Sequence, residues 1–211
     1  WITGIALIIL AGVVVVGGLK RVAAVTEKLV PFMAIAYIIG ALAIVMIHAT
    51  LIPAAFASIF KGAFAFRAVG GGIVGYGLKS AITYGFKRGA FSNEAGLGSS
   101  VMVHSSSNVK EPVQQGMWGI FEVFADTIIV CTMTALTILC SGVYDFTLYE
   151  SAAVEGVSLA DAGLLSGVAL TSAAFESVFG ALGNKFISIA VMLFAFSTIL
   201  GWSYYGERAI E

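Results

Sequence analysis

Long apolar stretches alternate with short polar ones along most of the chain. Residues 1–18, 32–51, 117–140 and 186–205 are apolar almost throughout. Each is close to the roughly 20 apolar residues that a helix needs to cross a bilayer. The pattern predicts an all-α, polytopic membrane protein in which these stretches are membrane spans.

Residues 70–106 depart from this pattern. They are too long for one straight span, and their middle is rich in glycine and carries Lys87 and Arg88. A segment that carries charged side chains and is interrupted by glycine is tolerated at membrane depth only where it packs within protein or lines a water-filled cavity. We therefore expect two half-helices separated by an unwound segment at residues 85–91, with Ser92 as the N-cap of the second half.

The polar connections predict the orientation of the spans. Residues 19–30 carry three basic residues against one acid, which indicates a cytoplasmic loop, and Pro31 suits the first turn of the next helix. Residues 142–185 carry five acids and one lysine and are expected to form a long extracellular loop. Two short helices are expected within that loop, one beginning near Ser158 and the other near Thr171.

The composition supports a membrane setting. The chain is 59% hydrophobic and 11% charged, with a net charge of -1, whereas soluble domains are about 25% charged. Lipid is therefore its expected surrounding, and a nucleic-acid partner is not expected. The chain begins at Trp1 and ends just after a span, so we expect a single transmembrane domain, residues 1–211, that is a piece of a longer protein.

The interrupted segment is the first candidate binding site. Backbone N–H groups from Ser92 onward lack intrahelical partners, and broken transporter helices direct such ends at a substrate carboxylate. Gly85 and Gly89 allow a ligand to approach the backbone, and Phe91 offers an apolar wall. The charged residues are better explained as an ion-pair cluster that holds the break: Lys87, Arg88 and Glu94.

The last span carries adjacent hydroxyl groups near its middle. Ser197, Thr198 and the carbonyl group of Phe194 provide hard oxygen ligands of the kind that suit an alkali cation. The competing explanation is that both hydroxyls bond to carbonyls one turn earlier. Trp202 lies one turn beyond Thr198 and either bounds the same cavity or belongs to an interfacial aromatic belt.

Asp126 lies near the middle of its span, four residues after Glu122. A carboxylate at that depth is costly unless it is paired or used. It can ligate a cation, relay protons, or pair with Lys79 or Lys87, and the sequence leaves these alternatives open. His104 is expected at a helix end without a partnered acid, so the residues do not favour an enzyme.

The segment GAFSNEAGLGS at residues 89–99 resembles the signature of the alanine or glycine:cation symporter family, the sodium:alanine symporters. Further resemblances lie along the chain at residues 18–23, 27–31, 52–56, 112–116, 126–127 and 194–207. The resemblance implies a fragment of the leucine-transporter-like inverted-repeat fold of the amino acid–polyamine–cation superfamily. The fragment would run from the end of helix 4 to helix 8, with helix 6 broken.

The resemblance also implies the site residues. Sodium, the coupling ion, would be bound by Ser197, Thr198 and the carbonyl group of Phe194, and Asp126 would form a second cation or proton site. Helix 1, which completes the substrate site and the sodium site in that fold, is among the missing helices of the full-length chain. The implied substrate-binding residues are Gly85, Gly89, Phe91, Ser92, Asn93 and Trp202.

These expectations describe a secondary active transporter. It would couple sodium entry to uptake of a small neutral amino acid, alanine or glycine, by alternating access in a bacterial or archaeal plasma membrane. A proton-coupled amino acid carrier, with Asp126 or Glu122 as the relay, is the close alternative. From a different class, a channel or a non-transporting structural membrane subunit explains the spans equally well, although the broken helix argues against the structural subunit.

Overall fold

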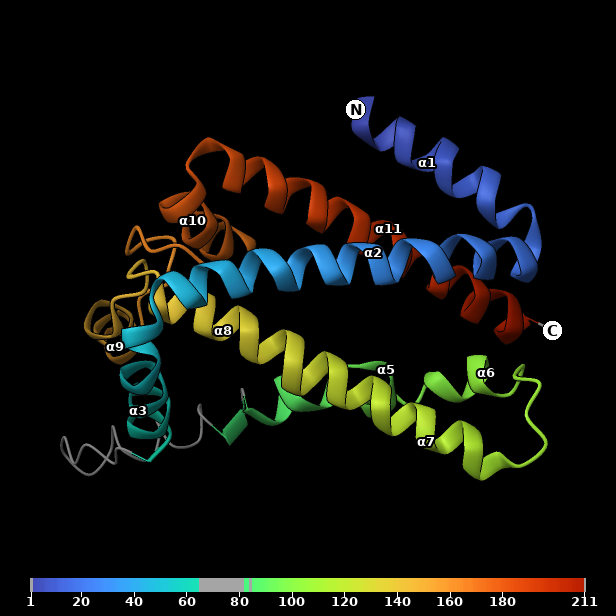
Figure 1. Ribbon diagram of the computed structural model, residues 1–211, viewed down its shortest axis with the longest axis horizontal. Helices are drawn as coiled ribbons and strands as arrows, with labels where there is room; N and C mark the ends of the chain where they lie inside the picture. Colours follow the sequence, from blue (N-terminus) through green and yellow to red (C-terminus); the bar gives the residue numbers. More distant parts are fainter. Residues whose placement is uncertain (1, 65–81, 84, 211) are drawn as a thin grey trace.

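The computed structural model describes residues 2–64, 82, 83 and 85–210, and within these residues the chain is helical and contains no strand (Figure 1). The predicted all-α fold is therefore confirmed for this part of the chain. Residues 85–90 are also helical, and most of the first half of the expected broken span lies outside the described residues. The labelled elements are α1 (Ile2–Val15), α2 (Gly18–Ile47), the 3-10 turn η1 (Ala49–Leu51), α3 (Ile52–Phe64), α5 (Glu94–Leu97), α6 (Ser100–His104), α7 (Pro112–Val123), the π-helix η2 (Phe124–Val130), α8 (Cys131–Cys140), α9 (Phe146–Glu155), α10 (Val168–Phe179) and α11 (Ala181–Ile210).

Three helical stretches among the described residues are long and apolar enough to cross a membrane: Lys20–Ile47, Pro112–Cys140 and Ala181–Ile210. α2 packs against both α8 and α11, and α11 also packs against α10 (Figure 1). The second stretch is a continuous rod in which α7, η2 and α8 follow one another without a loop. These rods form the frame on which the shorter helices are placed.

The prediction of a loop at residues 19–30 is wrong, because α2 is continuous from Gly18 to Ile47 and contains Pro31. Lysine, arginine and glutamate are good helix formers, so a charged run at a membrane edge does not need to end a helix. The break lies earlier, at Gly18, whose φ of 70° favours glycine. Arg21 then donates a hydrogen bond from Nη1 to the carbonyl oxygen of Val13, 3.0 Å away, in the last turn of α1.

The far end of α2 is also shorter than predicted. The helix ends at Ile47 rather than at residue 51, and His48 is its C-cap, with Nδ1 3.0 Å from the carbonyl oxygen of Ile44. The chain then turns through η1 into α3, which runs across the end of α2 (Figure 1). Pro53 lies in the first turn of α3, where its missing N–H is not needed.

The expected loop at residues 142–185 does contain two short helices, but neither begins where predicted. α9 begins at Phe146, and Ser158 instead forms a turn in which its hydroxyl donates to Asp161 Oδ2, 2.6 Å away. α10 begins at Val168, and α11 begins at Ala181 rather than at residue 186. Serine and aspartate favour turns as strongly as helix caps, which explains the misplaced start.

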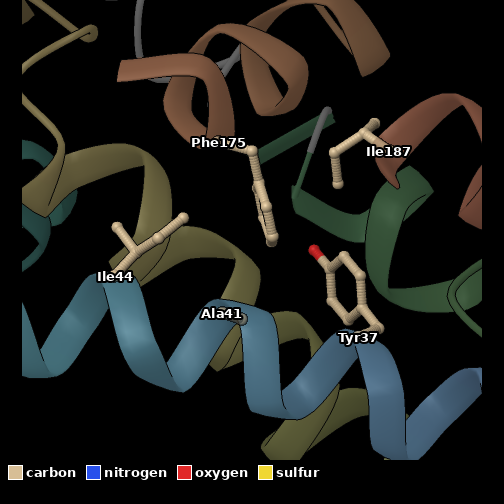
Figure 2. Packing of buried hydrophobic residues seen from close by; sticks show 5 residues of the cluster. All are labelled: Tyr37, Ala41, Ile44, Phe175 and Ile187. Atoms are coloured by element: carbon tan, nitrogen blue, oxygen red, sulfur yellow. The ribbon is translucent and has the colours of Figure 1, made fainter. Parts of the chain in front are cut away.

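The apolar core lies where α2, α10 and α11 meet (Figure 2). Phe175 of α10 is fully buried between the helices, and its ring stacks on Tyr37 with centroids 5.9 Å apart and on Phe186 at 5.5 Å. Gly40 makes this approach possible, because a Cβ there would lie 3.0 Å from Phe175 Cε1. Ile187 of α11 closes the cluster on the other side. This core holds α11 against α2.

Candidate functional site

The interruption in the chain lies at residues 91–93, later than predicted. Residues 85–90 form a helix, so the expected unwound segment at residues 85–91 is wrong. Asn93, and not Ser92, is the N-cap of α5: its backbone is extended, with φ −149° and ψ 170°, and its side chain accepts a hydrogen bond from Gly96 N. Asparagine and serine cap helices about equally well, so the sequence does not distinguish them.

The second half of the interrupted helix is itself divided. α5 has four residues, and Gly98 then adopts a left-handed φ of 82° before α6 begins at Ser100. Glu94 accepts a hydrogen bond from the hydroxyl of Ser99 across this turn. The expectation of one continuous second half-helix is therefore wrong, because α5 is a single turn and α6 follows it as a separate short helix.

Two backbone donors at the break have no partner among the described residues. The N–H groups of Ser92 and Asn93 form no hydrogen bond with any other described residue. Backbone N–H groups are obligatory hydrogen-bond donors, and at membrane depth there is little water to satisfy them. A ligand with an anionic or carbonyl oxygen can meet that need.

The rod opposite the break contains a π-helix. η2 spans Phe124–Val130, and it carries both Asp126 and Thr127. Thr127 Oγ1 lies 3.0 Å from Asn93 Nδ2 and 3.4 Å from Ser92 Oγ. Short π-helical turns are rare and occur frequently at functional sites. The break and the π-helix are thus joined directly through side chains.

Asp126 lies between two cavities. One, of about 510 Å³, separates α5 and α6 from α7 and is lined in part by Asn93, Glu94 and Glu122. The other, of about 290 Å³, lies among α2, α8, α10 and α11 and is lined in part by Phe194. Asp126 lines both. Asp126 is therefore the residue that the two cavities share.

The larger cavity also contains a histidine with an acidic partner. His104 Nε2 lies 3.7 Å from Glu122 Oε2, and His104 Nδ1 lies 2.6 Å from Gln115 Nε2. The expectation that His104 lacks a partnered acid is therefore wrong. The pairing joins α6 to α7 across the cavity and depends on tertiary packing, so the local sequence carries no signal for it.

The expected ion-pair cluster at the break is not formed within the described part of the chain. Neither Lys87 nor Arg88 pairs with Glu94, and Lys87 does not pair with Asp126. Lys79, the other cation considered for Asp126, lies outside the described residues.

The predicted sodium ligands lie together in α11. The hydroxyls of Ser197 and Thr198 both donate to the carbonyl oxygen of Phe194, at 2.8 and 2.9 Å. This is the back-bonding that the sequence left as the competing explanation, and it also gathers three oxygen atoms at one point of the helix. Each hydroxyl retains its acceptor lone pairs after donating its proton.

The remaining predicted substrate-binding residues do not contact one another around a single pocket in the described part of the chain. Gly85 and Gly89 lie on an exposed surface of the helix at residues 85–90, where a Cβ would meet no atom within 4 Å. Phe91 is 68% exposed. Trp202 is half-exposed on α11 and packs edge-on against Tyr205, and it does not line either cavity that Asp126 lines.

Thr127 and Tyr37 are the polar residues to which the sequence assigned no role. The hydroxyl oxygen of Tyr37 lies 2.7 Å from Thr134 Oγ1, and both residues line the cavity beside Asp126. A polar side chain inside an apolar span is a signal that could have identified both, and Thr127 also lies in the stretch at residues 126–127 that carries the family resemblance.

Comparison with known proteins gives a consistent result. Residues 1–211 match the sodium:alanine symporter family. The chain is 39% identical over 210 residues to the sodium/alanine symporter AgcS of Methanococcus maripaludis, covering 100% of this chain and 42% of that protein. It is 37% identical over 206 residues to the sodium/proton-dependent alanine carrier protein of Bacillus sp., covering 98% of this chain and 45% of that protein.

A third relative has a different named substrate. The chain is 36% identical over 207 residues to the probable sodium/glutamine symporter GlnT of Bacillus subtilis, covering 98% of this chain and 39% of that protein. The chain thus spans about two fifths of the length of these relatives. The match over its whole length confirms the resemblance carried by residues 89–99, and the chain belongs to the sodium:alanine symporter family.

Proposed function

We propose that the intact protein is a secondary active transporter that couples sodium entry to uptake of a small neutral amino acid, alanine or glycine. The observation that carries this proposal is the contact between the interruption at residues 91–93 and the π-helix that holds Asp126 and Thr127, at 3.0 Å from Asn93 Nδ2 to Thr127 Oγ1. Interrupted helices that meet polar side chains at membrane depth are typical of transporter binding sites.

The substrate carboxylate is proposed to bind at the break. The N–H groups of Ser92 and Asn93, which have no acceptor in the part of the chain that the structure describes, are suitable donors for it. Phe91 supplies an apolar surface beside them, and Gly85 and Gly89 leave the adjacent helix surface open. Trp202 remains a proposed boundary of the pocket, whose other walls belong to parts of the protein outside this chain.

Sodium is proposed to bind at α11. The hydroxyl oxygens of Ser197 and Thr198 keep acceptor lone pairs, and the carbonyl oxygen of Phe194 lies within 2.9 Å of both. Oxygen ligands of this kind suit a hard cation. The remaining ligands would come from helices outside this chain, so sodium would tie α11 to them.

A proton-coupled carrier is the second candidate, and a specific observation favours it. Asp126, Glu122 and His104 line one cavity, and carboxylates and imidazoles are the groups that relay protons. Two ion sites are also compatible with one protein, and the name of the Bacillus sp. relative includes both sodium and proton dependence. Asp126 is therefore proposed as a second cation or proton site.

The setting proposed for the intact protein is the plasma membrane of a bacterium or archaeon. In the leucine-transporter-like arrangement, α1 would be the end of helix 4, α2 helix 5, the interrupted segment helix 6, the α7–α8 rod helix 7 and α11 helix 8. Residues 142–180 would lie outside the cell. Alternating access would then move two groups of helices around the site.

The test is uptake of labelled alanine into proteoliposomes that contain the intact protein. A sodium gradient should drive saturable uptake, and a proton gradient alone should not. Uptake that depends on the proton gradient alone would assign the second candidate. Flux that does not saturate would indicate a channel, and no flux would indicate a structural subunit. Competition by unlabelled glycine and glutamine separates alanine or glycine specificity from the specificity named for GlnT.

A further inference from the structure

Thr127 joins the π-helix to the interrupted segment. Its hydroxyl oxygen lies 3.0 Å from the side-chain nitrogen of Asn93 and 3.4 Å from the hydroxyl oxygen of Ser92. All three side chains are half-buried. The two segments are more than 30 residues apart in the chain, so these are tertiary contacts.

Asn93 is held from two sides. Its side-chain oxygen accepts a hydrogen bond from Gly96 N at 3.2 Å and so caps α5, while its side-chain nitrogen donates to Thr127. Because an amide has a donor end and an acceptor end, the two bonds together allow a single orientation of the side chain. Asn93 therefore links α5 to η2, and that link orients the backbone N–H of Asn93.

Thr127 differs in this respect from other threonines of the same rod. The hydroxyls of Thr134 and Thr137 each donate to the carbonyl oxygen four residues earlier, at 2.9 and 2.8 Å. This back-bonding is the usual behaviour of threonine inside a helix. Within the described chain, Thr127 forms no such bond, and its hydroxyl is directed at the break instead. The π-helix changes the local register and presents this side chain to its partner.

We propose that Thr127 is a positioning residue for substrate binding. Through Asn93 it fixes the orientation of the backbone N–H groups at residues 92 and 93, without being required to touch the substrate itself. This inference rests on the proposed function. Pre-organised donors increase affinity because less order has to be imposed when the ligand binds. Loss of the Thr127 hydroxyl should therefore weaken substrate affinity more than it slows turnover.

The test compares variants of the intact protein in alanine uptake. Thr127→Val keeps the shape of the side chain and removes its hydroxyl, and it should raise the KM for alanine about tenfold with Vmax changed less than about twofold. Thr127→Ser restores the hydroxyl and should restore the KM. Thr137→Val is the matched control, because the Thr137 hydroxyl bonds, among the described residues, only to Met133 in its own rod, and the KM of this variant should stay unchanged. An unchanged KM in Thr127→Val, or an equal rise in Thr137→Val, overturns the proposal.

A second measurement separates this inference from the proposed function. Hydrogen–deuterium exchange of the amides of Gly96 and Leu97, which both bond to Asn93, should be faster in Thr127→Val than in the parent protein, and it should return to the parental rate in Thr127→Ser. That result supports the positioning role even if the parent transports no alanine, in which case only the proposed function fails. Unchanged exchange overturns the inference. If neither Thr127→Val nor Thr127→Ala folds, Thr127 serves the fold rather than the site, and the inference is also overturned.

Discussion

The hydroxyl groups of Tyr37 and Thr134 lie 2.7 Å apart and join α2 to α8. Thr134 gives its only hydroxyl proton to the carbonyl oxygen of Val130, at 2.9 Å, so Tyr37 must be the donor in the contact between the two side chains. The bond lies at the edge of the apolar core, where Tyr37 also stacks on Phe175. It fixes the distance between two of the rods that frame the cavity beside Asp126.

Replacing Tyr37 with phenylalanine should therefore lower the free energy of unfolding of the intact protein by about 0.5–1.5 kcal/mol. The ring packing is kept and only the donor is lost, while Thr134 retains its bond to Val130. Thermal unfolding of the detergent-purified protein measures the effect. Tyr149→Phe is the control, because Tyr149 donates to the carbonyl oxygen of Leu165 at an exposed position. An equal loss in both variants would contradict this role for Tyr37.

Gly40 should not tolerate a side chain. A Cβ there would lie 3.0 Å from Phe175 Cε1 and 3.3 Å from Phe186 Cε1, and both rings are packed in the core. Gly40→Ala should destabilise the protein by about 1–3 kcal/mol through overpacking. Gly206→Ala is the matched control in α11, where a Cβ meets no atom within 4 Å. The control should be neutral or slightly stabilising because alanine favours helix. Equal stability of the two variants would show that α10 does not pack closely on α2.

Removing one hydroxyl from the proposed sodium site should weaken sodium binding selectively. Thr198→Ala should raise the sodium concentration for half-maximal alanine uptake about tenfold, which corresponds to about 1.4 kcal/mol. The maximal rate at saturating sodium should stay close to that of the parent. Ser203→Ala is the control, since Ser203 donates to the carbonyl oxygen of Leu200 in the same helix but lies beyond the proposed ligands. A change in alanine affinity without any change in sodium dependence would remove Thr198 from the sodium site.

Asp145 should make the helix that follows it sensitive to acid. Its carboxylate accepts hydrogen bonds from Thr147 Oγ1 at 2.5 Å and from Thr147 N at 2.9 Å, and these bonds hold its pKa below the usual 3.8. Because the folded state favours the charged form, the stabilisation is present above the unfolded pKa and is lost as the pH falls through the folded pKa. Asp145→Asn keeps a capping side chain but does not titrate.

Thermal unfolding at about pH 6 and about pH 3 tests this dependence. The parent protein should lose more stability on acidification than Asp145→Asn, because other titrating groups contribute equally to both. An equal loss in the two proteins would show that Thr147 does not stabilise the charged carboxylate.

The three long apolar helices were predictable because the length of a span follows from bilayer thickness and depends on no single contact. The charged residues around Arg21 were misread as a loop, because a helix that leaves the membrane carries the same charges as a loop at its surface. The interruption near Ser92 was predictable from polarity and glycine content. The bounds of the interruption and its N-cap could not be predicted, because the neighbouring residues Ser92 and Asn93 cap helices about equally well. The π-helix around Thr127 has no sequence signature, and the pairing of His104 with Glu122 depends on packing between distant segments.

The most direct test of the central claim measures coupling itself. Proteoliposomes containing the intact protein, with equal sodium concentrations inside and outside and a trace of labelled sodium outside, are given an inward gradient of alanine. If the protein is a sodium:alanine symporter in function, alanine should drive uptake of labelled sodium above its equilibrium level, and D-mannitol at the same concentration should not. Sodium entry that is indifferent to alanine, while alanine itself still enters, would contradict the account.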